Sequence, residues 1–302
     1  LLQSIKIDVA SGQPFADVLS KYPHIFDRLY CGLIAASMQS GTLASMLKRI
    51  ADYLEKSASL KKKIRKALTY PAAILIVSLL VSGLLLFFVV PQFATLFNAY
   101  GAKLPLFTRM ILALSEFIQE YVEWIIGAII AMIYTFQYTK KNHAPFQDFL
   151  DHIALKTFVL GTLLKKAIIA RTLRTLSTTL SSGIPLIDAL TATANTSGNN
   201  VFTTAFLRIR DDVSNGQNLH QAMQNTQLFP PMIIQMVAIG EEAGSIAAML
   251  DKIANDYEED VDNTVNTLST LIEPLIMLIL GVVIGSFVLA MYLPVFKLGA
   301  VF

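Results

Sequence analysis

Acidic side chains are the main groups in this chain that could do chemistry, and they lie in two places. Glu241 and Glu242 stand between glycines in the pentapeptide 240–244, Gly-Glu-Glu-Ala-Gly. A second group follows close behind: Glu258, Glu259, Asp260 and Asp262. Catalytic carboxylate pairs need two carboxyl groups held close together in different environments. Adjacent residues of a helix point about 100° apart, so Glu241 and Glu242 suit helix capping and a surface contact better than catalysis.

The second acidic group has two interpretations: a solvated helix face, or a docking surface for a basic partner. A metal site is disfavoured, because the spacing does not resemble a calcium-binding loop. The four histidines are scattered without the spacing of a ligand motif: His24, His143, His152 and His220. The sequence also contains no Walker loop, no GxSxG and no GxGxxG. We therefore expect that the protein is not an enzyme and that it has no catalytic, cofactor-binding or metal-binding residues.

The elements that carry these residues occur twice in the chain. Residues 38–93 match residues 239–296 for most of their length at one constant offset. The matched positions include two glycines, two acidic residues and two pairs of prolines: Gly41 with Gly244, Glu55 with Glu258, Pro71 with Pro274 and Pro91 with Pro294. A shared register of this length indicates an internal duplication. Each copy reads as a soluble helical segment that leads into an apolar helix.

The apolar helix of each copy is long enough to cross a bilayer. Nineteen uncharged residues separate Pro71 from Pro91, and nineteen more separate Pro274 from Pro294. Nineteen helical residues span about 30 Å, the thickness of the hydrocarbon layer. The alternative is a buried core helix, but such helices usually have about 12 residues. Pro71 and Pro274 are expected at helix starts, and Pro91 and Pro294 at the exits.

Small residues recur four positions apart within both apolar segments. They are Ser78 and Ser82 in the first copy, and Gly281 and Gly285 in the second. This spacing places two small side chains on one helix face and allows another helix to approach closely. We therefore expect these four residues to pack in the membrane.

The composition agrees with a membrane protein. Hydrophobic residues make up 54% of the chain and charged residues only 15%, against about 25% charged in soluble domains. A net charge of +2 argues against nucleic-acid binding, which needs a concentrated basic face. Basic residues between Lys56 and Lys66 precede the first apolar segment, as expected for a cytoplasmic end. The single cysteine, Cys31, excludes an intrachain disulfide.

These patterns predict an all-α polytopic membrane protein with two repeated cytoplasmic helical-bundle domains and three transmembrane helices. The middle span is the weakest, but aromatic ends and the following Lys140 and Lys141 favour it. The chain must also return across the membrane between two equivalent domains. The predicted order is a first bundle at 1–69, spans at 71–91, 121–138 and 274–294, a periplasmic segment at 92–120, a second, six-helix bundle at 142–270 and a periplasmic tail at 295–302. The chain begins without Met inside the repeat unit, so the first bundle is expected to be N-terminally incomplete.

Several stretches together resemble one known family. They are residues 161–190 (GTLLKKAIIARTLRTLSTTLSSGIPLIDAL), 240–259 (GEEAGSIAAMLDKIANDYEE), the copy at 40–56 (SGTLASMLKRIADYLEK) and the two segments between prolines. They are similar to the inner-membrane platform proteins of type IV pilus and type II secretion machines, the PilC/GspF family. The resemblance covers nearly the whole chain. It departs from the family where the first bundle should contain a counterpart of RTLRTLSTTLSSGIPL.

The resemblance implies a bacterial inner-membrane platform with both large domains in the cytoplasm. Such a platform would couple a cytoplasmic hexameric assembly ATPase to pilin extraction and pilus polymerisation, alongside inner-membrane alignment proteins. A type II secretion platform acting on pseudopilins remains the alternative, and a homodimer is the simplest oligomer. Gly240, Glu241, Glu242 and Gly244, with Gly41, would be joints or contacts, since glycines permit close approach. A small-solute transporter is a distant alternative, because a transporter built on repeats would need polar or broken helices at mid-membrane, which are absent from the sequence.

Overall fold

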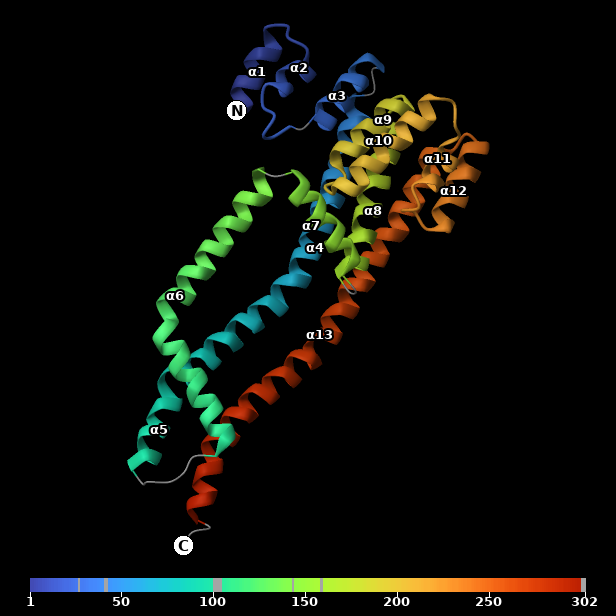
Figure 1. The fold of residues 1–302 in the computed structure, drawn as a ribbon. Helices are drawn as coiled ribbons and strands as arrows, with labels where there is room; N and C mark the ends of the chain where they lie inside the picture. Colours follow the sequence, from blue (N-terminus) through green and yellow to red (C-terminus); the bar gives the residue numbers. More distant parts are fainter. Residues whose placement is uncertain (27, 41–42, 100–104, 143, 158–159, 300–302) are drawn as a thin grey trace. The chain divides into compact units, whose positions relative to one another are not determined.

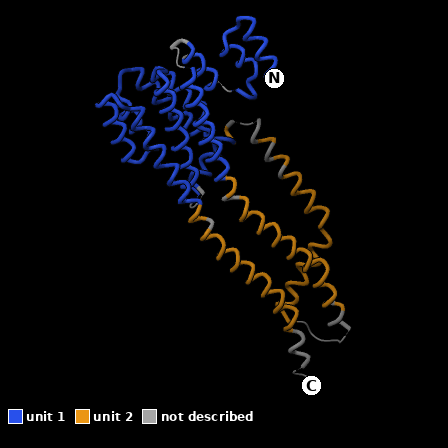
Figure 2. Tube along the Cα trace, turned by 180° about the vertical axis from the view of Figure 1, so that it is seen from behind, with its two compact units in different colours: residues 1–64, 147–265 blue, residues 65–146, 266–302 orange. Residues whose placement is uncertain are grey.

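A computed structural model describes the chain except residues 27, 41–42, 100–104, 143, 158–159 and 300–302, and every regular element in the described part is a helix (Figure 1). The chain forms two compact units, each made of two separate stretches of sequence (Figure 2). Unit 1 contains Leu1–Ile64 and Gln147–Val265, and unit 2 contains Arg65–Phe146 and Asn266–Phe302. The all-α class predicted from the sequence is confirmed for the described residues.

The first stretch of unit 1 holds three helices and the beginning of a fourth: α1 (Leu2–Ala10), α2 (Phe15–Ser20), α3 (Arg28–Ser40) and α4 (Leu43–Leu84). Their core contains the fully buried side chains of Val18, Leu19, Leu33, Ile34 and Ile50. Within α4, for example, the buried residues Met46, Ile50 and Tyr53 recur four and three positions apart, which places them on one inward face.

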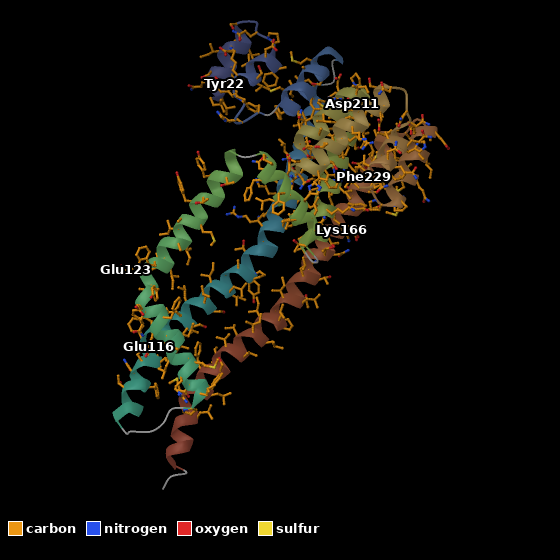
Figure 3. The ribbon with its side chains drawn as sticks, in the orientation of Figure 1. Tyr22, Glu116, Glu123, Lys166, Asp211 and Phe229 are labelled. Carbon is orange, nitrogen blue, oxygen red and sulfur yellow. The ribbon has the colours of Figure 1, made fainter. Side chains whose placement is uncertain are left out.

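The second stretch of unit 1 is a larger bundle. Its helices are α7 (Ala144–Lys156), α8 (Leu160–Ser181), α9 (Leu186–Thr196), α10 (Asn200–Ser214), α11 (Leu219–Asn225), α12 (Pro231–Glu242) and the beginning of α13 (Ile246–Gly299). Asn199 caps α10, because its side-chain oxygen accepts hydrogen bonds from the main-chain N–H groups of Val201 and Phe202. The rings of Phe202 and Phe206 lie edge-to-face on the ring of Phe229 in the core. Phe229 is labelled in Figure 3.

The repeated helices α4 and α13 are continuous through Pro71 and Pro274. The prediction that these prolines begin helices is therefore wrong. A proline inside a helix removes one main-chain hydrogen bond, but membrane helices tolerate it where neighbouring groups satisfy the freed carbonyl. Likewise, the structure remains helical around Pro91 and Pro294 rather than ending there. Proline spacing marked the apolar segments correctly but did not mark helix boundaries.

Unit 2 contains the apolar parts of α4 and α13, a π-helical turn η1 (Leu85–Val89), α5 (Val90–Ala99) and α6 (Leu106–Asn142). Two helical stretches in the described part are long and apolar enough to cross a membrane, Leu43–Phe93 and Ile246–Leu293. Only 11% and 17% of their most apolar windows are buried, unlike core helices of soluble proteins. The span at 121–138 lies within α6, which is not one of these two, and it stays a prediction. The sole tryptophan, Trp124, is 77% exposed on α6.

Candidate functional site

A polar groove lies within unit 1. It has a volume of about 980 Å³ and lies between the beginning of α4, α8 and the beginning of α13. Charged side chains of both signs line it: Arg49, Asp52, Glu55, Lys56, Arg174 and Asp251. Hydroxyl groups complete the lining: Tyr53, Ser59, Ser177, Thr178, Ser181 and Ser245. Such a surface suits a polar partner.

Arg174 on α8 is the central charge of this groove. Its side chain is only 6% exposed. The guanidinium donates to three residues of α13, namely Glu258 through Nε at 2.9 Å, Asn255 through Nη2 at 2.6 Å, and Asp251 through Nη1. A buried charge is costly unless it is paired and hydrogen-bonded. These bonds therefore fix the register of α8 against α13.

The acidic group on α13 is largely neutralised by cations of the chain itself. Besides Glu258, Asp260 pairs with Lys166 of α8 at 2.9 Å, and Asp262 pairs with Lys63 of α4 at 2.5 Å. Glu259 is exposed. Three of the four acidic residues thus hold unit 1 together, an outcome that neither sequence interpretation anticipated.

The beginning of α4 packs against α8 through polar contacts. The hydroxyl groups of Tyr53 and Thr175 lie 3.2 Å apart, and Arg49 donates to the Ser181 carbonyl at 3.1 Å. The repeat correspondence adds a contrast here. Asp52 and Glu55 occupy the positions of Asn255 and Glu258, but they are exposed, and neither is paired with a described residue. The first copy therefore presents an open acidic pair where the second copy holds an arginine.

Glu241 ties the end of α12 to the beginning of α11. Its carboxylate accepts the main-chain N–H groups of Leu219 at 2.8 Å and His220 at 3.3 Å, and lies 2.6 Å from Nδ1 of His220. Burial raises the pKa of this carboxyl, but the hydrogen bonds and charge from His220 and the bond from Leu219 outweigh it, so the pKa is lowered overall. Helix capping, as expected from the sequence, describes this geometry.

The glycines beside Glu241 have different surroundings. Gly240 is buried, and an added Cβ would lie 3.0 Å from Cγ of Met249 and 3.1 Å from Cα of Ile246. Gly244 has a φ of +63°, a left-handed conformation that favours glycine, in the turn before α13. Glu242 is exposed at the end of α12. Gly41 lies outside the described residues. The connection between α12 and α13 thus combines close packing at Gly240 with a left-handed backbone conformation at Gly244.

The two glycines of the second apolar segment, Gly281 and Gly285, have open space beside them in the described part of the chain. No described atom lies within 4 Å of a Cβ built on Gly281 or Gly285. Ser78 donates to the Ile74 carbonyl of its own helix at 2.6 Å, and Ser82 is half-buried. The packing role of these small residues therefore stays a prediction.

Sequence reasoning missed three polar residues of α6. Thr108, Ser115 and Gln119 donate hydrogen bonds to main-chain carbonyls of other helices in unit 2. The prolines inside the apolar helices could have indicated them, because each proline leaves a carbonyl without its helical donor.

Comparison with known proteins places the chain in a family. The family model for type II secretion system protein F matches residues 1–91 and 172–294. The type IV pilus assembly protein PilC of Pseudomonas aeruginosa is 50% identical over 301 residues, covering 100% of this chain and 80% of the relative. TapC, a type IV pilus assembly protein of Aeromonas hydrophila, is 46% identical over 99% of this chain and 72% of the relative.

A more distant relative belongs to the secretion branch. Type II secretion system protein F of Pseudomonas aeruginosa is 30% identical over 99% of this chain and 73% of the relative. The relatives of both branches cover 99–100% of this chain, in agreement with a resemblance that extends over nearly the whole sequence. The chain belongs to the type II secretion system protein F family, which includes the PilC pilus assembly proteins.

Proposed function

We propose that the protein is a non-enzymatic inner-membrane platform of a type IV pilus assembly machine. The observation that carries the proposal is the difference in identity between the two branches of relatives. Within one organism, Pseudomonas aeruginosa, the pilus assembly protein is 50% identical to this chain and the secretion protein 30%. The two candidate membrane helices and their exposed apolar windows support a membrane location.

In this proposal the chain crosses the inner membrane three times, with the middle span in α6, and both bundles lie in the cytoplasm. The bundles receive motion from a cytoplasmic ATPase, and the apolar helices pass it to pilin subunits. The polar groove of unit 1 is our candidate contact for the cytoplasmic partner. Its open acidic pair, Asp52 and Glu55, suits a partner that presents arginine or lysine side chains.

Gene deletion tests the assignment. Cells without the gene should lack surface pili under the electron microscope while their exoproteins reach the medium normally. Re-expression should restore pili. A matched control is a chimera in which these 302 residues replace the aligned part of the Pseudomonas aeruginosa PilC, which should support piliation in a strain that lacks its own PilC.

A type II secretion platform is the second candidate, because family members named type II secretion system protein F are 29–31% identical across the chain. It predicts the opposite result: intact pili, with exoproteins retained in the periplasm. If deletion changed neither pili nor secretion, the platform proposal would be wrong.

A further inference from the structure

One helix of unit 2 donates side-chain hydrogen bonds to the main chain of both repeated apolar segments. From α6, Thr108 Oγ1 donates to the Ala290 carbonyl of α13 at 2.8 Å. Gln119 Nε2 donates to the Phe87 carbonyl at 3.1 Å, and Ser115 Oγ donates to the Leu86 carbonyl, both in η1. The side chains of Thr108 and Ser115 are buried. Positions 108, 115 and 119 are seven and four residues apart, so they lie on one face of α6.

Prolines explain why two of these carbonyls need an outside donor. In an α-helix each carbonyl accepts from the N–H four residues later. For Ala290 and Phe87 that residue is Pro294 and Pro91, which have no N–H. Neither carbonyl can therefore accept the usual α-helical hydrogen bond from the residue four positions later in its own helix.

The Leu86 carbonyl loses its donor for a different reason. In the π turn, the Val90 N–H bonds to the Leu85 carbonyl instead of the Leu86 carbonyl. The π-helical donor for Leu86 would be five residues later, and that residue is Pro91. The carbonyls of Leu86, Phe87 and Ala290 each lack their regular helical donor. Each of them accepts a hydrogen bond from a side chain of α6 instead.

The repeat makes this arrangement more specific. Phe87 and Ala290 are corresponding positions of the two copies, because Pro91 corresponds to Pro294. The helix α6 lies between the two copies in the sequence and donates a hydrogen bond to the carbonyl at each of these corresponding positions. Apolar side chains surround them: Leu86, Val90 and Phe287 are buried, and Ile111 and Leu112 pack against them. Water cannot easily replace a missing donor in such surroundings, so an unpaired carbonyl is costly there.

We propose that α6 is a latch that joins the two copies of the apolar helix at their proline sites. With the latch closed, Thr108, Ser115 and Gln119 supply the missing donors and hold the exits of both apolar helices against α6. With the latch open, the proline sites become the points at which these helices bend. This device goes beyond the platform role, and its test does not require pilus formation.

The test measures local opening of unit 2 in the full chain, reconstituted in lipid nanodiscs. A Cys31→Ser background removes the native thiol, and Val90→Cys introduces a thiol at a position that is 5% exposed. The rate of labelling by N-ethylmaleimide then reports how often the site opens. Thr108→Val removes the donor and nearly keeps the side-chain volume. Thr95→Val is the matched control, because Thr95 donates to the Gln92 carbonyl within its own helix.

Thr108→Val should accelerate labelling about 3- to 18-fold, the range for one hydrogen bond between membrane helices, and Thr108→Ser should label like the parent. The decisive step is the same substitution in a Pro294→Ala background. Alanine restores the N–H that pairs with the Ala290 carbonyl, so the effect of Thr108→Val should fall below about twofold there.

An equal effect of Thr108→Val in both backgrounds would overturn the latch, as would an effect no larger than that of Thr95→Val. If the Pro294→Ala variant does not fold, the same double-mutant cycle can be made at the corresponding site, the Phe87 carbonyl and Pro91. Gln119→Leu should accelerate labelling in the parent, and Pro91→Ala should reduce that effect. Additivity of these two changes would likewise contradict the proposal.

Discussion

Replacing Arg174 with leucine should destabilise unit 1 more than any other single loss of charge described above. The guanidinium is 6% exposed and holds Glu258, Asn255 and Asp251. Removing one partner of a buried ion pair costs about 3–5 kcal/mol, because the remaining charge is left unpaired. Here the side chain of Glu258 is 21% exposed and that of Asp251 is 53% exposed, so water compensates part of the loss. We expect a loss of about 2–3 kcal/mol.

The assay is a urea titration of the full chain in detergent micelles with brief proteolysis at each concentration. Mass spectrometry follows cleavage within residues 160–265, so the midpoint reports on unit 1. Arg210→Leu is the control, because Arg210 pairs with Asp211 at the surface, and exposed pairs contribute about 0–1 kcal/mol. Arg174→Lys should recover only part of the loss, since lysine cannot reproduce the fork of donors. If Arg174→Leu shifted the midpoint no more than Arg210→Leu, the reasoning about this buried arginine would be refuted.

Three further predictions concern other sites. Because the folded-state pKa of Glu241 is lowered, its ionised form should stabilise the fold above the unfolded value of about 4.3, with the contribution lost as the pH falls through the lower, folded value. Glu241→Gln should therefore flatten the acid limb of a thermal-stability profile, and an unchanged limb would contradict this. Gly240→Ala should lower the free energy of unfolding by about 1–3 kcal/mol, because the added methyl group would overpack against Met249. Gly281→Ala is the control, because its methyl group would lie in open space. Equal melting temperatures of the two variants would count against close packing at Gly240. Gly285→Leu should reduce pilus assembly, scored by piliation, without preventing membrane insertion, scored by membrane fractionation. Wild-type piliation of this variant would contradict the predicted packing role of Gly285.

The sequence predicted the helical class and the two apolar segments because both depend on local pattern and length. Nineteen uncharged residues form a helix that cannot be buried in a small bundle, and the structure leaves those faces exposed. The sequence also indicated that Glu241 would cap a helix. Its partner His220 was not, because residues 21 positions apart meet only through the bundle's packing.

The arginine site and the α6 hydrogen bonds were beyond sequence reasoning for a similar reason. Arg174 is separated by 77 to 84 residues from its partners, and only the packing of α8 on α13 brings them together. The error at Pro71 and Pro274 has a different cause. A proline preference for the first helical turn describes helix starts in water, whereas these helices begin far earlier and continue through the prolines.

The single exposed tryptophan on α6 makes the chain its own optical probe. When Trp124 alone is excited at the red edge of protein absorption, the emission colour depends on the polarity around one helix, with no background from other indole rings. Lipids brominated at graded positions along the acyl chain would quench this emission most strongly at the depth where the ring lies. The native protein, unlabelled, can thus show whether residues 121–138 lie in hydrocarbon, at the headgroups or in water.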